Sequence, residues 1–338
     1  MSANDGVLVG AKRMIDSIIE KVVNNQHPSF ELVATKKSKK STTFAFNHHS
    51  RIKRIACTLR VLDVALRRSG QMTRRDLFYM DTTLFGDQLH VDLAVVTLAA
   101  TFGVGRDSLG ISAGITGLVY GELSVGGLCC TKQVQIARTP EKGLNPEIAP
   151  EIVLIVEKEA IFNALVHCFE DIKEQLGHTL LLVTGRGYPC LGTLRFVHWL
   201  SQTISPTSNF FILVDYDPYG LDIAMNYKCG TKHIQDQADT CCATLKFLGV
   251  KRTHLDAVHA DGPDHSRHPI NQRGKLTAKR VIAAAGQIGW ADVSICASEL
   301  LAGGFGTEIE AIYNESDKGN GLISWISSQL RNALGEFM

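Results

Sequence analysis

The chain contains 338 residues, of which 45% are hydrophobic and 20% are charged, and its formal net charge is +1. This composition argues against extensive disorder and against a uniformly basic coat for nucleic acid, so DNA contacts would have to come from local patches. The length suits about two domains. Nine cysteines without a C-x-x-C pair are typical of reduced, intracellular thiols, and no apolar run is long enough to span a bilayer.

Residues 1–50 are predicted to form an N-terminal helix and a basic arm. Four apolar residues recur at helical spacing within residues 7–23: Ile15, Ile18, Ile19 and Val22. This apolar face packs either on its own domain or on another protein. The run KKSKK at 36–40 is expected to be exposed, where it would serve nuclear import, contact phosphates or simply form a solvated loop.

Residues 51–125 carry the pattern of a winged helix-turn-helix domain. A basic helix is predicted over 51–68, and a second helix over 93–104 ends near Gly103. After the GVGR turn, RDSLGI is predicted to begin another helix, and the alternating run ITGLVYGEL is predicted to form a strand. This is the order of a winged helix-turn-helix, which commonly presents its second helix to a DNA groove. Arg106, at the start of that helix, is a candidate DNA contact.

A single tyrosine, Tyr79, lies among arginines, acids and a glutamine in the stretch RRDLFYMDTTLFGDQLHVD. A phenol with a pKa of about 10 needs nearby positive charge or a metal to attack phosphate near neutral pH. Tyr79 beside Arg74 and Arg75 is therefore a candidate nucleophile. The pattern alone is weak, because tyrosines next to arginines are ordinary on protein surfaces.

Residues 126–150 are rich in glycine and proline, and the sequence predicts a linker and domain boundary there. From 151 to 338, apolar runs such as EIVLIVE, TLLLVTG and NFFILVDYD alternate with helical patterns. Such alternation predicts an α/β domain with a parallel sheet and helices on both faces, whose ligands collect beyond the carboxyl ends of the strands.

Three acids lie at such strand ends. Glu157 closes EIVLIVE, and Asp215 and Asp217 close FFILVDYD. Residues two apart in extended backbone point to the same side, and carboxylates without histidine or cysteine suit Mg²⁺ or Mn²⁺ better than zinc. The alternative is that these acids are helix caps or solvated turn residues.

Three blocks occur in a characteristic order: RDLFYMD-x-x-LF-x-x-Q-x-x-VD, VEKEAIF and LVDYDPYG. In this order they resemble the topoisomerase VI A subunit family, and most of all its eukaryotic meiotic double-strand-break transesterase, sporulation protein eleven. The resemblance covers about residues 50–315. It implies an α+β winged-helix domain that carries the catalytic tyrosine, followed by a Toprim domain with a Rossmann-like parallel sheet.

The resemblance also implies a mechanism. Tyr79 would attack a DNA phosphodiester, remain joined to the 5′ phosphate and release a 3′ hydroxyl, while Arg75 would stabilise the negative charge of the pentacovalent phosphate. Glu157, Asp215 and Asp217 would hold Mg²⁺, with Mn²⁺ as a possible substitute. Two further basic residues are candidate DNA contacts: Arg74, and Arg186 of the loop TGRGYP.

The partners implied are double-stranded DNA, a second copy of the chain, meiotic accessory proteins and the ATPase-like topoisomerase VI B-type subunit, in the nucleus. In the family the tyrosine of one protomer meets the metal site of another, so an active site requires a homodimer. Three positions depart from relatives, one of which is Cys190, where an acid is frequent. Phe78 replaces a first tyrosine and leaves Tyr79 as the nucleophile candidate, and Thr116 stands where a lysine is frequent in the wing.

Three other functions remain open. The A subunit of a type IIB topoisomerase would cut in the same way but reseal the DNA after strand passage. A Toprim nuclease would use metal-bound water and would leave no protein on the DNA end. A DNA-binding or scaffolding paralogue would retain the fold with an inactive site.

Overall fold

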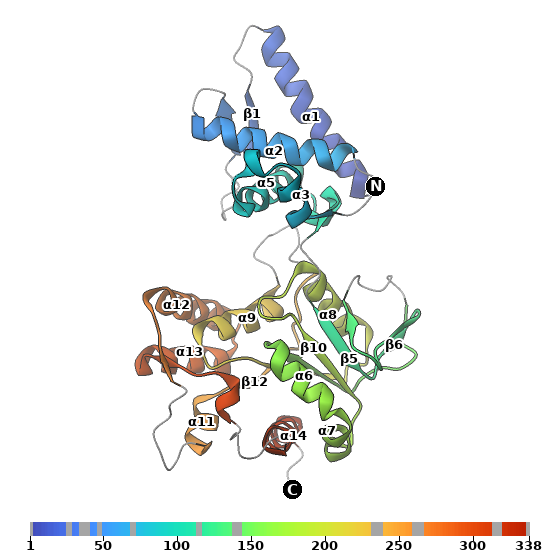
Figure 1. The fold of residues 1–338 in the computed structure, drawn as a ribbon, viewed down its shortest axis with the longest axis vertical. Coiled ribbons are helices and arrows are strands. Elements are labelled where there is room, and N and C mark those ends of the chain that lie inside the picture. The colour runs from blue at the N-terminus through green and yellow to red at the C-terminus, as the bar shows by residue number, and fades with distance from the viewer. Residues whose placement is uncertain are drawn as a thin grey trace. The chain divides into compact units, whose positions relative to one another are not determined.

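The computed structural model describes residues 3–24, 29–33, 41–45, 49–67, 72–112, 117–136, 144–230, 239–258, 267–312 and 320–335. The chain forms two compact units, with a division between Gly114 and Ile115 (Figure 1). The run KKSKK at 36–40 and Thr116 lie outside the described residues. No described helix combines the length and the apolar character that crossing a membrane requires.

The first unit is mainly helical. Its elements are α1 (Ala3–Val23), β1 (Ser29–Val33), β2 (Ser41–Ala45), α2 (His49–Arg67), β3 (Met72–Thr73), α3 (Arg74–Met80), α4 (Thr82–Phe85), α5 (Gln88–Phe102), η1 (Arg106–Leu109) and β4 (Ile111–Ser112). Strands β1 and β2 pair antiparallel, and the short strands β3 and β4 pair parallel. The core of this unit collects apolar side chains from α1, α2, α3 and α5.

Helix α1 packs on this core with a different face from the one predicted. Val7, Ala11 and Met14 are buried, whereas Ile15 and Ile19 are 47% and 53% exposed. The residues at 7, 11 and 14 also follow helical spacing, and Ile18 of the predicted stripe packs with them, partly buried, against the core. The other two described side chains of the predicted stripe, Ile15 and Ile19, stay exposed.

Within the predicted winged-helix domain of residues 51–125, two of the predicted helices are confirmed and the third is wrong. Helix α2 covers the predicted basic helix, and α5 ends where expected because Gly103 adopts the left-handed conformation with φ 67°. The predicted helix at RDSLGI is instead the four-residue 3₁₀ turn η1. Gly110, at φ 68°, directly follows this turn and leaves too few residues for an α-helix.

The second unit is built on a six-stranded sheet with the order β12-β11-β9-β10-β5-β8. Four of its strands run parallel to one another as predicted: β9 (Ile152–Val156), β10 (Leu180–Thr184), β11 (Asn209–Leu213) and β12 (Lys246–Gly249). Strands β5 (Leu118–Gly121) and β8 (Val134–Gln135) are added antiparallel at one edge.

The position of β5 corrects the predicted domain boundary. The run ITGLVYGEL was expected to be the wing of the first domain, and 126–150 the linker, but β5 pairs with β10 of the second unit. Leu118 and Val119 are buried there, 5% and 1% exposed. The segment after β5 stays with this unit too, since it carries β6 (Ser124–Val125), β7 (Leu128–Cys129) and β8.

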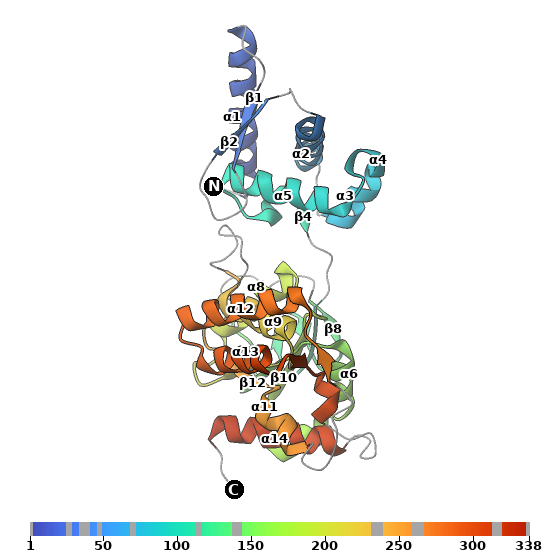
Figure 2. The same ribbon diagram turned by 90° about the vertical axis from the view of Figure 1, so that its left-hand side faces the viewer.

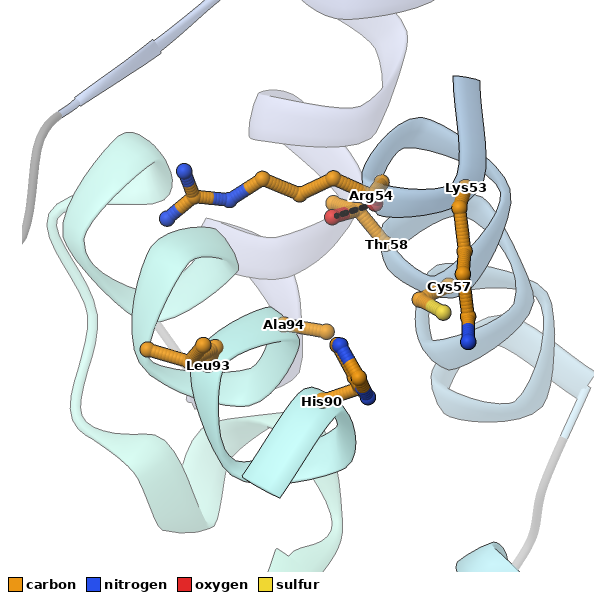
Figure 3. Close-up of a pocket in the computed structure, with 7 residues that line it drawn as sticks. All are labelled: Lys53, Arg54, Cys57, Thr58, His90, Leu93 and Ala94. Atoms are coloured by element: carbon orange, nitrogen blue, oxygen red, sulfur yellow. Dashed lines mark hydrogen bonds between the residues drawn. The ribbon is translucent and has the colours of Figure 1, made fainter. Parts of the chain in front are cut away.

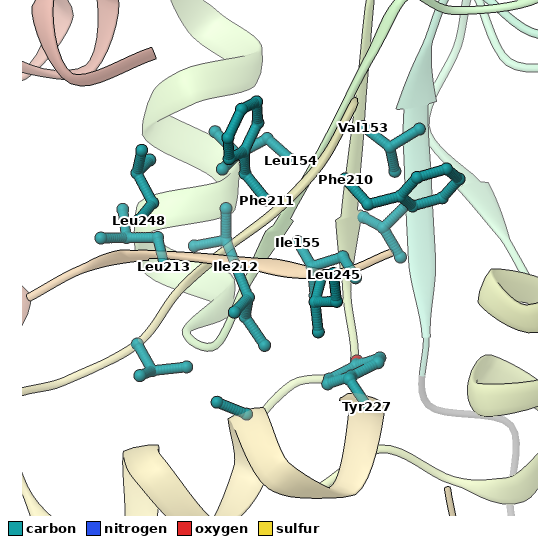
Figure 4. Close-up of a cluster of buried hydrophobic side chains, with 14 of the residues drawn as sticks. Val153, Leu154, Ile155, Phe210, Phe211, Ile212, Leu213, Tyr227, Leu245 and Leu248 are labelled. Carbon is teal, nitrogen blue, oxygen red and sulfur yellow. The ribbon is translucent and has the colours of Figure 1, made fainter. Parts of the chain in front are cut away.

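The core of the second unit lies around β9 and β11 (Figure 4). Every residue of β9 is fully buried, which requires helices on both faces of the sheet. The helices are α6 (Glu159–His167), α7 (Phe169–Leu176), α8 (Leu191–Thr203), α9 (Pro218–Cys229), α11 (Arg252–Val258), α12 (Gln272–Gln287), α13 (Ala291–Gly303) and α14 (Asn320–Leu334). Helices α9, α12 and α13 form one packed group (Figure 2).

The strand register brings the predicted acids to one edge. Val156 pairs with Thr184 on one side and with Leu213 on the other, so β9, β10 and β11 end at the same level. The residues that follow these strands therefore share the carboxyl edge of the sheet.

Candidate active site

Tyr79 lies on the short helix α3, which has seven residues. A capping box begins the helix: the Asp76 backbone N–H donates to Thr73 Oγ1 at 3.1 Å, and the Thr73 N–H donates to Asp76 Oδ2 at 3.2 Å. Leu77 is fully buried and anchors the helix in the core, while the Tyr79 side chain is 61% exposed. Such a short helix depends on its cap and its buried anchor, and both present Tyr79 to solvent.

The two arginines before Tyr79 have different surroundings. The Arg75 guanidinium carbon lies 5.9 Å from the centre of the Tyr79 ring. Arg74 Nη1 instead lies 2.8 Å from Asp92 Oδ1, an ion pair that ties α3 to α5. The structure therefore brings Arg75 to the predicted nucleophile and gives Arg74 a structural contact. Arg106 is half-buried in η1, and the DNA-binding roles of Arg74 and Arg106 stay predictions.

The carboxylates of the second unit come together at the carboxyl edge of the sheet. Glu157 directly follows β9, and its Oε2 accepts the Asp215 backbone N–H at 3.0 Å. Asp215 is 8% exposed. Asp217 is the N-cap of α9, because its Oδ1 accepts the N–H groups of Tyr219 and Gly220 at 2.9 and 2.6 Å. Asp217 is therefore a helix cap, which was the alternative interpretation of these acids, and it also belongs to the carboxylate cluster.

Gly220 lets α9 approach these acids closely. A Cβ at this position would lie 2.6 Å from the Asp215 carbonyl oxygen and 3.0 Å from Glu157 Oε2. Any larger residue would push the start of α9 away from the carboxylates. The glycine two residues after Pro218 is therefore required by the geometry of the site.

Lys158 is a member of this site that the sequence did not single out. Its Nζ lies 3.3 Å from Asp215 Oδ2, 3.2 Å from Glu308 Oε2 and 2.7 Å from Glu310 Oε2. The segment that carries these glutamates also binds Asp215 directly, since the Ile309 N–H donates to Asp215 Oδ1 at 2.9 Å. The only signal in the sequence was a lysine immediately after the strand-end acid in VEKE.

Burial and mutual repulsion change the acidity of the cluster. Burial, followed by the charge of Asp215, raises the pKa of Glu157 to about 8. Burial raises the pKa of Asp215 to about 6, although the Ile309 N–H and Lys158 act in the opposite direction. Negative charge in this cluster is therefore undercompensated, which favours an added cation.

The donor set suits a hard divalent cation. One oxygen of each carboxylate accepts a backbone N–H, which leaves Glu157 Oε1, Asp217 Oδ2 and the lysine-paired Asp215 Oδ2 as ligand atoms. As they stand, no three acidic, histidine or cysteine side chains among the described residues surround a single ion position. The residues fit Mg²⁺ in chemistry, and its binding requires the free oxygens to converge.

The predicted Arg186 loop lies against the same edge. Arg186 has a left-handed backbone with φ 58°, its N–H donates to Thr184 Oγ1, and its guanidinium lies 3.1 Å from Glu159 Oε1. The N–H of Gly187 donates to the Glu157 carbonyl oxygen at 2.9 Å. This loop thus fixes the backbone of Glu157, and contact between Arg186 and phosphate stays a prediction.

A separate pocket of about 330 Å³ lies between α2 and α5 in the first unit (Figure 3). Its lining residues are Lys53, Arg54, Cys57, Thr58, His90, Leu93 and Ala94. His90 is half-buried, and its Nδ1 has no hydrogen-bond partner among the described residues. None of the predicted catalytic or metal-binding residues lines this pocket.

Two family models match the chain. The model for the Toprim domain shared by Spo11 and the topoisomerase 6 A subunit matches residues 152–317, which include the carboxylate cluster. The model described as type IIB DNA topoisomerase matches residues 50–111, which include Tyr79. The match to the first model agrees with the observed mixed α/β fold and its parallel sheet.

Curated relatives of two kinds are similar to the chain. The A3 subunit of DNA topoisomerase 6 from rice is 30% identical over 236 residues, which cover 67% of this chain and 52% of the rice protein. Meiotic recombination protein rec12 of fission yeast is 30% identical over 201 residues, which cover 58% of this chain and 56% of the yeast protein. Mouse meiotic recombination protein SPO11 is 26% identical over 310 residues, covering 83% and 76%. The chain thus spans about half the length of the rice and fission yeast proteins.

Proposed function

Because the chain belongs to the family of topoisomerase VI A subunits and Spo11 proteins, we propose that it makes DNA double-strand breaks by transesterification and so initiates meiotic recombination. The observation that carries this proposal is the placement of Tyr79: an exposed phenol on a capped helix, with the Arg75 guanidinium 5.9 Å from its ring. A tyrosine kept for packing would bury its ring, and this one does not.

The proposed reaction exchanges one phosphoester for another. Tyr79 Oη attacks a DNA phosphorus, the bond between phosphorus and the 3′ oxygen breaks, and a 5′ phosphotyrosyl bond forms. The phenol loses its proton and the leaving 3′ oxygen gains one, so the products are a protein-linked 5′ end and a free 3′ hydroxyl. Arg75 is placed to bind the phosphate oxygens on which negative charge increases during attack.

The proposed cofactor is Mg²⁺, with Mn²⁺ as an alternative, held by Glu157, Asp215 and Asp217. When bound, the ion supplies positive charge that stabilises the phosphate and the leaving oxygen. The fixed carboxylate oxygens orient these ligands, and the Ile309 N–H holds Asp215 Oδ1. Lys158 pairs with the other oxygen, Asp215 Oδ2, and would share it with the ion. The high pKa of Glu157 means that metal binding must release a proton near neutral pH.

The first unit is proposed to bind double-stranded DNA as a winged helix-turn-helix variant in which α2, α3 and α5 supply the helices. The wing cannot be β5, which belongs to the other sheet. The proposed phosphate contacts outside the reacting centre are Arg74 and Arg106 of this unit and Arg186 of the second unit. Mutation of any one should weaken binding for all DNA sequences alike.

The partners proposed are a second copy of the chain, meiotic accessory proteins and a topoisomerase VI B-type subunit, in the nucleus. The homodimer would join the tyrosine of one protomer to the acids of the other. The exposed stripe of α1 supports a protein partner for the N-terminal helix. Its members are Leu8, Ile15, Ile19 and Val23, which are 57%, 47%, 53% and 76% exposed.

A resealing A subunit of a type IIB topoisomerase is the second candidate, because the rice relative is as similar to the chain as the fission yeast meiotic protein is. Both functions use the same covalent step. ATP-dependent relaxation of supercoiled DNA by the chain with its B-type partner would replace the meiotic proposal with this one.

The test of the chemistry is a denaturing pull-down from cells in which the chain acts, followed by end-labelling of attached DNA. We expect label on the wild type and none on Tyr79→Phe. Tyr120→Phe is the matched control, because it removes the same hydroxyl from the half-buried Tyr120 of β5 and should retain the label. Breaks without attached protein in both wild type and Tyr79→Phe would identify a metal-dependent nuclease instead.

A further inference from the structure

A buried carboxylate outside the proposed metal site holds an arginine at the surface. Asp222 lies on α9 and is 5% exposed. Its Oδ2 accepts the Tyr188 hydroxyl at 3.0 Å and lies 2.8 Å from Arg280 Nη2. The Arg280 side chain is 54% exposed, so one nitrogen is fixed by the buried acid while much of the guanidinium faces solvent.

The helix that carries Arg280 is strongly basic on its exposed side. Four cationic residues of α12 are exposed: Arg273, Lys275, Lys279 and Arg280. The sequence of α12 from Gln272 to Gln287 contains no acid, although the whole chain is nearly neutral. None of the described carboxylates forms an ion pair with Arg273, Lys275 or Lys279. A packing contact between α9 and α12 would need one ion pair, not a row of cations.

This basic helix begins beside the proposed metal ligands. A Cβ on Gly274, in the first turn of α12, would lie 3.6 Å from Pro218 Cγ, and Pro218 directly follows Asp217. Arg280 reaches Asp222, one turn further along α9. Both helices therefore start at the carboxyl edge of the sheet, so the first turn of α12 lies near the carboxylate cluster and the later cations of α12 follow α9 away from it.

Spacing along α12 suits a linear polyanion. Arg273 and Arg280 are two turns apart, which places them on the same flank of the helix and about 10 Å apart along its axis. One DNA strand carries a phosphate for about every 3.4 Å of axis, so the two arginines can reach different phosphates of one strand. The positive end of the helix dipole at Gln272 adds to this field.

We propose that α12 forms a DNA backbone-binding surface next to the carboxylate cluster, with Arg280 held in position for a phosphate by Asp222 and Tyr188. The proposal rests on the proposed function and specifies where the duplex beside the cleaved bond is held. Arg280 contacts phosphate, and Asp222 is a positioning residue that acts through Arg280.

The experiment measures binding of a short DNA duplex to the full chain over a range of salt concentrations. Arg280→Gln should weaken binding roughly tenfold at low salt and reduce the slope of log affinity against log salt by about one. Lys246→Gln is the control. It removes a charge at the start of β12, and because β12 runs parallel to β11 this position lies at the amino ends of the strands, away from the carboxylate cluster. It should leave affinity and slope close to wild type.

Two further measurements separate positioning from damage. Asp222→Asn should weaken binding in the wild-type background but have little additional effect in the Arg280→Gln background, because it acts through Arg280. Stabilisation of the protein by added Mn²⁺ should be the same in Arg280→Gln as in wild type, which shows that the carboxylate cluster is intact.

Equal affinity and equal salt slope for Arg280→Gln and Lys246→Gln would overturn the inference, even if the wild type forms its Tyr79 adduct. An additive effect of Asp222→Asn would overturn the positioning role. If Arg280→Gln weakens binding as expected but the wild type never forms the adduct, the proposed chemistry fails and the binding surface stands.

Discussion

Replacing Glu157 by Gln should stabilise the metal-free protein at high pH, although the residue belongs to the proposed metal site. Glutamine has nearly the same shape, and its carbonyl oxygen can still accept the Asp215 N–H that Glu157 accepts at 3.0 Å. The substitution therefore removes a charge and leaves the packing and the hydrogen bond in place. The difference between the two proteins reports the free energy of burying that charge.

The sign and size follow from the raised pKa. Burial and Asp215 raise the pKa of Glu157 from 4.5 to about 8. Below about pH 4.5 the Glu157 carboxyl is protonated in both the folded and the unfolded chain, so its raised pKa does not change the free energy of unfolding. Between about pH 4.5 and 8 the unfolded chain loses this proton while the folded chain keeps it, so the folded state loses stability progressively and the loss is complete above about 8. At about 1.4 kcal/mol per pKa unit, the full shift corresponds to at most about 5 kcal/mol. Partial solvation of this half-buried group reduces the expected effect to about 2 kcal/mol.

Tryptophan fluorescence during urea unfolding measures this effect in the right part of the molecule. Trp199, Trp290 and Trp325 are the tryptophans of the chain, and all three belong to the second unit. With EDTA present, we expect wild type and Glu157→Gln to have similar free energies of unfolding at about pH 5, and the variant to be more stable at about pH 8. Added Mg²⁺ should stabilise the wild type more than the variant.

A variant that is less stable than wild type at the higher pH without metal would refute the reasoning. It would mean that the carboxylate of Glu157 gains more from its neighbours than it loses by leaving water. The raised pKa and the undercompensated charge would then both be wrong for this site.

Three further changes test other parts of the structure. Gly220→Ala places a Cβ 2.6 Å from a backbone oxygen and should lower the free energy of unfolding by about 2 kcal/mol. Gly286→Ala is its control, because a Cβ there meets nothing within 4 Å and should be neutral or stabilising. Urea unfolding followed by tryptophan fluorescence measures both. Thr73→Ala removes the cap of α3 and should cost about 1 kcal/mol, seen as faster amide exchange in α3, with the exposed Thr83→Ala as control. Phe211→Ala empties a fully buried site of β11 and should lower the second unit's stability by about 3–5 kcal/mol; a loss below 1 kcal/mol would contradict the packing.

The parallel sheet could be predicted because its strands are buried on both faces. Residues 152–156 and 209–213 must then be apolar almost throughout, and such runs separated by helical patterns have few other interpretations. The acids were predictable for the same reason, since Glu157 and Asp215 interrupt the apolar character where the strands end. Sequence position alone thus identified the edge at which they meet.

The domain division could not be predicted from the local pattern. Leu118–Gly121 has the alternation of any half-buried strand, and the same alternation suits a wing of the first unit or an edge of the second sheet. Pairing with β10, about 60 residues later in the chain, decides between them. Lys158 was missed for a related reason, because its partner Glu310 is 152 residues away in sequence.

The contact between Ile309 and Asp215 has a consequence for how the protein is made. The Ile309 N–H binds a nearly buried carboxylate 94 residues earlier, and Thr307 pairs with Tyr216 through both backbone hydrogen bonds. A chain still on the ribosome exposes Asp215 long before it exposes Ile309, so the carboxylate has no backbone donor from this segment until then. We expect nascent chains and fragments that stop short of Ile309 to lack a properly formed acid cluster. A protein proposed to break chromosomes would thereby be inert until translation has passed that residue.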